Sequence, residues 1–239
     1  MKIKKILTSM TQAILLSIGL LISLGAGLAI GYVGGLVKDQ PVLTQKEMKE
    51  QINNISKNSE VYFGSGEKLG TINSELIRKT VTYENIGDNV KNAIIASEDS
   101  NFYSNSGIDI WAVLRATHSE ATGARTTGGS TITQQLVKNQ LLDNSRSYER
   151  KAKEILLALR VDSHFSKNEI LENYLNVAPF GKNSLGQNIS GIETAAQGVF
   201  GVHSKELNIA QAAYLVGFVQ LPYTYTPFDS AGNIRPDEE

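Results

Sequence analysis

The chain of 239 residues is 41% hydrophobic and 20% charged, and its formal net charge is −1. This balance supplies apolar side chains for one sizeable core, and it argues against an acidic disordered chain and a basic nucleic-acid-binding protein. The absence of cysteine excludes disulfides, thiolate metal sites and a cysteine nucleophile. His118, His164 and His203 lie far apart in the sequence, so we interpret them as surface or packing residues.

The first forty residues predict a membrane anchor. Lys2, Lys4 and Lys5 precede an uncharged run over 6–37, which exceeds the roughly 20 apolar residues that a spanning helix needs. Lysines on this side favour a cytoplasmic N-terminus and an exported remainder. A cleaved signal peptide is the alternative, but the run is longer than the roughly 7 to 15 residues of a signal h-region.

The next segment, 38–59, is rich in Lys, Gln, Asn and Glu with a weak helical pattern, and we interpret it as a stalk. The sequence "EVYFGSGEKLGTI" then alternates around glycines, which predicts a short β-hairpin. "SGEK" in this hairpin matches the Ser-x-x-Lys motif of transpeptidases, but without a downstream Lys-Thr-Gly box we interpret it as a chance match. The expected parts are a cytoplasmic tail (1–10), a transmembrane helix (11–37), the stalk (38–59), a folded domain (60–228) and the start of a linker to a further domain (229–239).

From Asn89 onward, apolar residues recur at helical spacing, which predicts a mainly α-helical core. Ser166 and Glu169 have the spacing of a capping box at the start of the helix "KNEILENYLN". Ser130 is the expected N-cap of a second helix, "TITQQLVKNQLL".

This second helix could bind an anion. Its polar residues form one stripe apart from the apolar face, and they are Thr131, Gln134 or Gln135, and Lys138. The N-terminus of this helix, which follows "TTGG", offers free backbone N–H groups and a positive dipole end that suit a phosphate or pyrophosphate. The alternative is a solvated amphipathic face. Basic residues also outnumber acidic ones over 138–160, which favours an anionic ligand, although pairs such as Glu149 with Lys153 have the spacing of ordinary helical ion pairs.

Six segments occur in a fixed order: "ASEDSNFYSNSGID", "GGSTITQQLVKN", "RKAKE", "KNEILENYLNVAPFG", "GIETAAQGVFG" and "LNIAQAAYLVGFVQLPYTYTPF". Together they closely resemble the motif regions of the peptidoglycan glycosyltransferases, glycosyltransferase family 51, over about residues 60 to 228. With its anchor, the chain resembles the front part of a class A penicillin-binding protein, and its fourth-motif region is most similar to the Gram-positive 2A type. The resemblance implies a mainly α, lysozyme-like domain of two lobes. The smaller lobe, around 105–127, would dip toward the bilayer, with Trp111 either an interfacial anchor or a buried residue.

The resemblance implies a cell-wall synthesis enzyme that polymerises lipid II into β-1,4 glycan strands, with inversion and release of undecaprenyl pyrophosphate. It implies Glu98 as the base, Asp99 as a supporting residue and Glu154 as the second catalytic glutamate. The implied substrate-binding residues are Asp99, Phe102, Ser130, Thr131, Gln134, Gln135, Lys138, Arg150 and Lys151. Asn176 and Gly181 are expected to be structural.

No cofactor is required by this chemistry, and the sequence contains no dedicated metal cage, so Mg²⁺ or Mn²⁺ near Glu98 is expected only as an accessory. The expected partners are lipid II, the nascent glycan strand, the membrane and other cell-wall synthesis proteins, and not nucleic acid. Moenomycin, a phosphoglycolipid that mimics the donor in this family, is the expected inhibitor.

Asn105 departs from the family pattern, which commonly has a histidine at this position. An asparagine amide donates and accepts hydrogen bonds, but it carries no charge near neutral pH. Activity would survive if the histidine only orients its neighbours, and it would be lost if the histidine must be charged. We expect it to survive, because both glutamates and the cationic residues are present. Two other functions stay open: a lytic transglycosylase-like hydrolase, which also uses a glutamate, and a membrane scaffold that binds lipid II without turnover.

Overall fold

The structure is a computed structural model. It describes residues 2–38, 43–55, 60–65, 67–71, 76–122, 129–143, 145 and 147–236. The chain divides into two compact units, the first formed by Met1–Val42 with Arg146–Lys153 and the second by Leu43–Ser145 with Glu154–Glu239.

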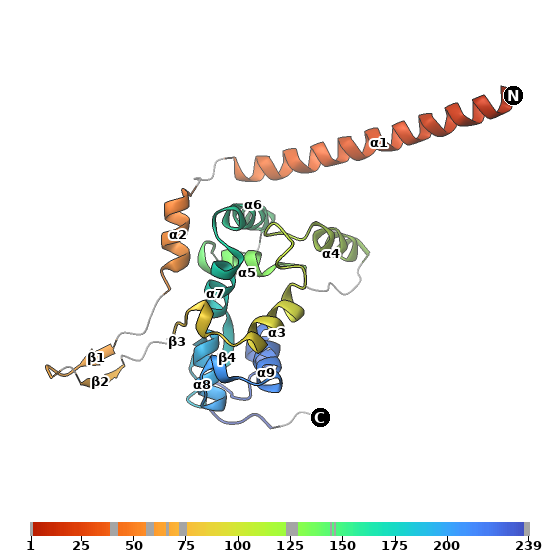
Figure 1. Ribbon diagram of the computed structural model, residues 1–239. Coiled ribbons are helices and arrows are strands. Elements are labelled where there is room, and N and C mark those ends of the chain that lie inside the picture. The colour runs from red at the N-terminus through yellow and green to blue at the C-terminus, as the bar shows by residue number, and fades with distance from the viewer. Residues whose placement is uncertain are drawn as a thin grey trace. The chain divides into compact units, whose positions relative to one another are not determined.

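The first unit contains one long apolar helix, α1 (Lys2–Val37), drawn in red in Figure 1. Its segment Met10–Leu36 is long and apolar enough to cross a membrane, by length and composition. The side chains of this segment that the structure describes are nearly all exposed, among them Leu16 and Ile30. A long apolar helix without a buried face is typical of a segment that meets lipid, as the sequence predicts for 11–37.

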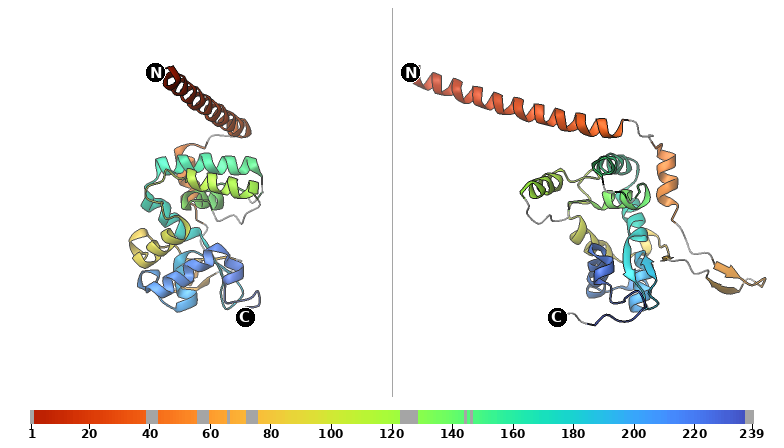
Figure 2. Two further views of the ribbon diagram at one scale, coloured as in Figure 1. Left: turned by 90° about the vertical axis from the view of Figure 1, so that its right-hand side faces the viewer. Right: turned by 180° about the vertical axis from the view of Figure 1, so that it is seen from behind.

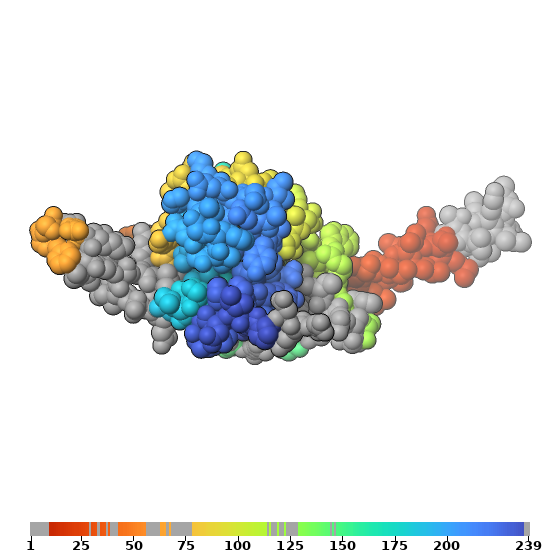
Figure 3. Space-filling view, turned by 90° about the horizontal axis from the view of Figure 1, so that it is seen from below, coloured from red at the N-terminus to blue at the C-terminus, as the bar shows by residue number. Residues whose placement is uncertain are grey.

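The second unit is mainly helical, which confirms the predicted fold class. Its helices are α2 (Gln45–Asn53), α3 (Asp88–Glu98), α4 (Ile110–Thr122), α5 (Ile132–Gln140), α7 (Lys167–Val177), α8 (Ile192–Phe200), α9 (Ile209–Gln220) and α10 (Pro222–Tyr225), with 3-10 turns η1 (Tyr83–Asn85) and η2 (Ser204–Glu206); α6 (Tyr148–His164) begins in the first unit and ends in this one. Helix α3 packs against α9, and α5 packs against α7 (Figures 1 and 2). Figure 3 looks onto the C-terminal helices, in blue, with the segment around α3 in yellow. One apolar core results, and it includes Phe102, Leu136 and Tyr174.

Two small sheets accompany the helices. Strands β1 (Glu60–Tyr62) and β2 (Lys68–Thr71) form the predicted antiparallel hairpin. A second sheet was not predicted: β5 (Asn188–Ser190) lies between β3 (Leu76–Arg78), which is parallel to it, and β4 (Pro179–Lys182), which is antiparallel. Strands of three or four residues are too short to show the alternation by which a strand is recognised in sequence.

The predicted stalk is wrong for its described part, 43–55, which belongs to the folded unit. Thr44 caps α2 through a complete capping box with Glu47. Met48 and Ile52, one helical turn apart, are fully buried in the core. A guanidinium nitrogen of Arg160 also donates to the carbonyl oxygen of Leu43 at 2.6 Å. The burial of one apolar stripe therefore moves the start of the folded unit back from residue 60. The rest of the predicted stalk lies largely in 39–42 and 56–59, outside the described residues.

Two helix starts test the predicted caps. The capping box of Ser166 and Glu169 is present at the start of α7. The predicted cap Ser130 is wrong by one residue, because Thr131 is the N-cap of α5 and forms a capping box with Gln134. Threonine serves this role as well as serine does, since either hydroxyl accepts from the backbone of the first turn.

Asn176 and Gly181 are structural, as expected. The amide of Asn176 binds both backbone groups of Val81, accepting from its N–H at 2.9 Å and donating to its carbonyl at 2.8 Å. At Gly181 a Cβ would lie 2.5 Å from the carbonyl oxygen of Pro222. Asn176 thus joins two distant segments of the second unit, and Gly181 permits the close approach of Pro222.

Candidate active site

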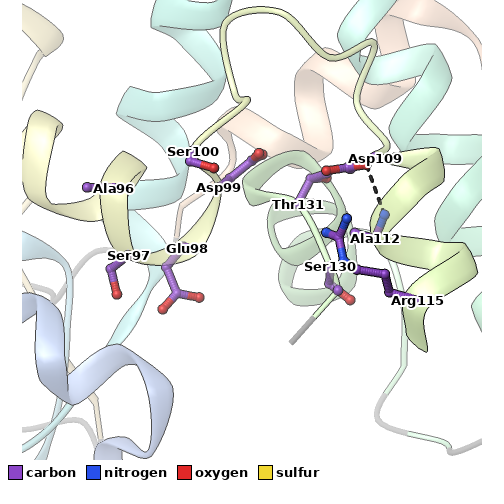
Figure 4. A pocket seen from close by; sticks show the side chains of 11 residues that line it. Ala96, Ser97, Glu98, Asp99, Ser100, Asp109, Ala112, Arg115, Ser130 and Thr131 are labelled. Atoms are coloured by element: carbon purple, nitrogen blue, oxygen red, sulfur yellow. Dashed lines mark hydrogen bonds between the residues drawn. The ribbon is translucent and has the colours of Figure 1, made fainter. Parts of the chain in front are cut away.

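Glu98 is the last residue of α3 and lines a cavity of about 190 Å³. Val90 and Ile94 bury one face of α3 against the core, and the helix ends where Asp99 leaves helical geometry at φ −158° and ψ 76°. The carboxylate of Glu98 is therefore fixed at a helix end, beside open space (Figure 4). The other residues that line this cavity are Ala96, Ser97, Asp99, Ser100, Asp109, Ala112, Arg115, Gly129, Ser130 and Thr131.

The Glu98 carboxylate is held from one side. Gln135 Nε2 in α5 donates to Glu98 Oε2 at 2.8 Å, and the hydroxyl of Tyr174 in α7 donates to Gln135 Oε1 at 2.9 Å. Glu98 Oε1 is shielded from water and has no hydrogen-bond partner within the described part of the chain. An ionised carboxylate in this position keeps unused capacity to accept a hydrogen bond.

Asp99 also lines the cavity, but its carboxylate is bound by protein groups. Both of its oxygens accept from Asn105 Nδ2, at 3.0 and 3.1 Å, and Oδ2 also accepts from the backbone N–H of Ile132 at 3.1 Å. Burial raises the pKa of Asp99, whereas these hydrogen bonds and the positive charge of Lys167 oppose that rise. Glu98 and Asp99 are adjacent in sequence, yet only Glu98 has a carboxylate oxygen left unbound.

Asn105 joins Asp99 to a partly buried cation, Lys167. Its Oδ1 accepts from the backbone N–H of Gly107 at 3.0 Å and from Lys167 Nζ at 3.2 Å. Lys167 Nζ also binds the Asn105 carbonyl oxygen at 2.8 Å and Asp162 at 2.5 Å. Asn105 thus orients Asp99 without carrying a charge, while Lys167 supplies positive charge close by.

Gly107 lets the loop after α3 approach two helices closely. Its φ of 86° is in the left-handed region, and a Cβ there would lie 2.5 Å from the carbonyl oxygen of Ala158. The hydroxyl of Thr131, the N-cap of α5, donates to the Gly107 carbonyl at 2.6 Å. This contact ties the loop that contains Asn105 to the start of α5.

Helix α5 contacts both of the predicted catalytic glutamates. Gln135 binds Glu98, and the Nε2 of the fully buried Gln134 approaches Glu154 Oε1 at 3.4 Å. Glu154 is itself only 2% exposed. The predicted polar stripe is therefore largely turned into the protein, and the alternative of a solvated face fits only Lys138, which is exposed.

Several predicted substrate-binding residues are buried. Phe102 and Gln134 are fully buried, and Lys167 Nζ lies 4.8 Å from the centre of the Phe102 ring. Thr131 is 2% exposed because its side chain caps α5. Burial favours a supporting role for Phe102 and Gln134, whereas Thr131 also lines the cavity; substrate contact by these residues stays a prediction. Ser130 lines the cavity with Glu98.

The N-terminus of α5 is already occupied by protein groups. The N–H of Ile132 donates to Asp99, and the N–H of Gln134 donates to the Thr131 hydroxyl. The phosphate site predicted from free N–H groups at this helix start is therefore wrong at these two positions. A carboxylate from the chain itself takes the place that an anion would have.

The predicted cations lie in two elements. Lys138 is in the last turn of α5, whereas Arg150 and Lys151 lie in the first turns of α6, which belong to the first unit. The expected ion pair of Glu149 with Lys153 is present at 2.9 Å. Contact of Arg150 and Lys151 with a phosphate or pyrophosphate stays a prediction.

Two cavity residues were missed from sequence. Arg115 in α4 lies across the cavity from Glu98, and Asp109 precedes α4 (Figure 4). The N–H of Ala112 donates to Asp109 at 2.9 Å, which is the main reason that the pKa of Asp109 is lowered; the charge of Arg115 contributes further. The available signal was a cation within the apolar stretch "IDIWAVLRA". Trp111 is 73% exposed, so the alternative of a buried tryptophan is wrong.

The described residues do not form a metal site. They contain no group of three His, Cys, Asp or Glu side chains placed to hold an ion. Asp99, the carboxylate nearest to Glu98 in sequence, has both oxygens engaged by Asn105. An accessory Mg²⁺ or Mn²⁺ near Glu98 stays a prediction.

Comparison with known proteins agrees with the motif pattern. A family model described as transglycosylase matches residues 65–238. The chain is 36% identical over 223 residues to a penicillin-binding protein 1A of Clostridium perfringens, covering 91% of this chain and 32% of that protein. It is 43% identical over 171 residues to penicillin-binding protein 1A of Aquifex aeolicus, covering 71% and 23%. It is 37% identical over 212 residues to penicillin-binding protein 2a of Streptococcus pneumoniae, covering 88% and 27%. The chain thus spans a third or less of the length of these relatives, and both the 1A and the 2a types are similar to it.

Proposed function

Because the chain belongs to the transglycosylase family, we propose that it is a peptidoglycan glycosyltransferase that polymerises lipid II into β-1,4 glycan strands. The observation that carries this proposal is the state of Glu98: it ends a rigid helix, lines a cavity with Ser130 and Arg115, and has one carboxylate oxygen without a partner among the described residues. A general base needs this combination of fixed position and unused acceptor capacity.

In the proposed reaction Glu98 accepts the proton of the attacking hydroxyl. The 4-hydroxyl of the incoming lipid II sugar attacks the anomeric carbon of the growing strand, and its proton passes to the Glu98 carboxylate. The new C–O bond forms as the bond to the lipid pyrophosphate breaks, and the pyrophosphate leaves with the electron pair. Displacement from the opposite face converts the α-linked donor into a β-1,4 product. Glu98 lines the cavity, so its carboxylate can take this proton when the acceptor sugar binds there.

The leaving pyrophosphate requires positive charge. Arg115 lines the cavity, and Lys138 is exposed at the end of α5. An arginine fork binds phosphate oxygens in pairs, whereas a lysine acts as a point charge. We assign both to substrate binding, together with Arg150 and Lys151 from the resemblance. Glu154 is assigned the role of the second catalytic carboxylate from the resemblance.

The substrate's lipid places the reaction at a membrane surface. Helix α1 has the length and composition to cross a bilayer, and Lys2, Lys4 and Lys5 precede it. The positive-inside rule supports a cytoplasmic N-terminus and a second unit on the outer side. Ile110 and Trp111 are exposed at the start of α4, which supports contact between this helix and the membrane–water interface.

The proposal is tested with lipid II in detergent. The full chain is expected to convert lipid II into glycan strands, and Glu98→Gln is expected to lower this rate by at least about 10²-fold, the usual contribution of a general base. The matched control is Glu84→Gln, an exposed glutamate in η1, which is expected to retain full activity. Full polymerisation by Glu98→Gln would contradict the base assignment.

The same assay distinguishes the proposed function from the two alternatives, a lytic hydrolase and a scaffold that binds lipid II. A lytic enzyme would shorten preformed peptidoglycan and ignore lipid II. A scaffold would bind lipid II and leave it unchanged, with or without added Mg²⁺ or Mn²⁺. Titration of these ions against the polymerisation rate also tests whether an accessory metal is used. Moenomycin is expected to compete with the donor, and Lys138→Ala is expected to weaken that competition. Lys46→Ala, which alters an exposed lysine of α2, is its control.

A further inference from the structure

Three helices contribute to a continuous chain of hydrogen bonds that ends at Glu98. Tyr174 Oη in α7 lies 2.9 Å from Gln135 Oε1 in α5, and Gln135 Nε2 lies 2.8 Å from Glu98 Oε2 at the end of α3. Tyr174 is fully buried, whereas Gln135 and Glu98 are half-buried. A residue on the far side of α5 is thus connected to the carboxylate of the site.

Chemistry fixes the direction of both bonds. An ionised carboxylate can only accept, so Gln135 must turn its NH₂ group toward Glu98 and its carbonyl oxygen toward Tyr174. The Tyr174 hydroxyl must then donate. Burial, and secondly the negative charge of Glu98, raises the pKa of Tyr174 above its ordinary range, so this hydroxyl keeps its proton. One arrangement of protons satisfies all three groups.

The Glu98 carboxylate depends on this chain for its orientation. Its Oε1 has no partner in the described segments, so the bond from Gln135 is the one that holds the group there. Without the donating hydroxyl, the Gln135 amide could rotate and present its oxygen to Glu98. That rotation would replace an attraction with the repulsion of two acceptors.

We propose that Tyr174 is a positioning residue for the catalytic base, which it orients through the amide of Gln135. This inference rests on the proposed function, because it assumes that Glu98 accepts the proton of the acceptor sugar. The competing explanation is that the bond only satisfies a buried tyrosine hydroxyl, as buried polar groups require. The two explanations differ in whether loss of the hydroxyl changes the chemical step of correctly folded protein.

Tyr174→Phe keeps the ring in the core and removes only the hydroxyl. We expect kcat for lipid II polymerisation to fall about tenfold, the effect of one lost hydrogen bond on a transition state. KM is expected to stay unchanged, because the fully buried Tyr174 cannot touch substrate. The control is Tyr223→Phe, which alters a half-exposed tyrosine of α10 and is expected to keep kcat at the wild-type value.

A second variant tests the connection itself. Gln135→Leu is expected to lower kcat at least as much as Tyr174→Phe, and the double variant is expected to be no slower than Gln135→Leu alone, because both changes break one chain. Melting temperatures are measured for all variants, so that only folded protein is compared. Wild-type kcat in Tyr174→Phe, or independent losses that multiply in the double variant, would overturn the role of Tyr174. Absence of lipid II turnover in wild-type protein would instead overturn the proposed function, and this inference with it.

Discussion

Replacing Asn105 by aspartate should destabilise the second unit at neutral pH. The two side chains have the same shape, but the change removes the NH₂ group that donates to both Asp99 oxygens at 3.0 and 3.1 Å. Loss of a hydrogen bond to a charged group costs about 1.5 to 3 kcal/mol. Two carboxylates roughly 3 Å apart repel by about 5 kcal/mol at an effective dielectric constant of about 20, and Lys167, 3.2 Å from Asn105 Oδ1, offsets part of this repulsion.

The expected net loss is about 3 kcal/mol of unfolding free energy, which lowers the melting temperature by about 6 to 12 °C in a domain of about 150 to 250 residues. The loss should shrink on acidification. Burial already raises the pKa of Asp99 in the wild-type protein, and a second carboxylate raises it further. A raised pKa in the folded state means that stability is greatest at low pH and is lost as pH rises through that pKa. The deficit is therefore expected to be large at pH 7.5 and small near pH 4.

Thermal and urea unfolding of the full chain in detergent, at both pH values, measure this difference. Asn101→Asp is the matched control, because Asn101 is exposed and its amide also lies near an aspartate, Asp109, at 3.4 Å. It should change stability by less than about 1 kcal/mol. Asn105→His, which keeps an N–H donor, should be milder than Asn105→Asp. The reasoning is refuted if Asn105→Asp melts with wild-type protein, or if its deficit is equal at the two pH values.

Two further variants test the fold and the cavity. Met48→Ala should cost about 2 to 4 kcal/mol of unfolding free energy, because Met48 is fully buried in the core. The control is Glu50→Ala, which alters an exposed residue of the same helix. Equal urea midpoints for the two variants would restore the stalk interpretation. Arg115→Ala should raise KM for lipid II about tenfold or more, because a hydrogen bond to a charged group is worth about 1.5 to 3 kcal/mol. Steady-state kinetics would contradict this prediction if Arg115→Ala and Arg115→Lys both kept the wild-type KM.

Local patterns predicted most of the helices, the hairpin and the Ser166 cap, because each depends on residues within one or two turns. The second sheet was not predictable, since β3 and β5 are separated by more than 100 residues and are each three residues long. Burial of α2 was missed because its apolar stripe has only Met48 and Ile52. Such a short stripe looks the same in sequence whether it packs on a core or faces water.

The site was predicted unevenly for a related reason. Sequence motifs indicated Glu98 and Glu154, but not that neighbouring glutamines of α5 each approach one of them across 37 and 20 residues of sequence. The polar stripe of α5 suggested contact with substrate, whereas most of it makes contacts inside the protein. A polar residue on a helix can serve either purpose, and only the position of its partner decides which.

The structure also accounts for the absence of a histidine at position 105. Asp99 is a buried carboxylate, so it needs donors and nearby positive charge. It receives donors from Asn105 and from the N-terminus of α5, whose first N–H groups carry partial positive charge. Full positive charge comes from Lys167, which binds Asn105 itself. A charged histidine would add a cation where one is already present, whereas a neutral side chain need only donate. Asparagine is therefore sufficient to hold Asp99, and the contacts that keep α5 and its glutamines in register with Glu98 do not depend on the charge of residue 105.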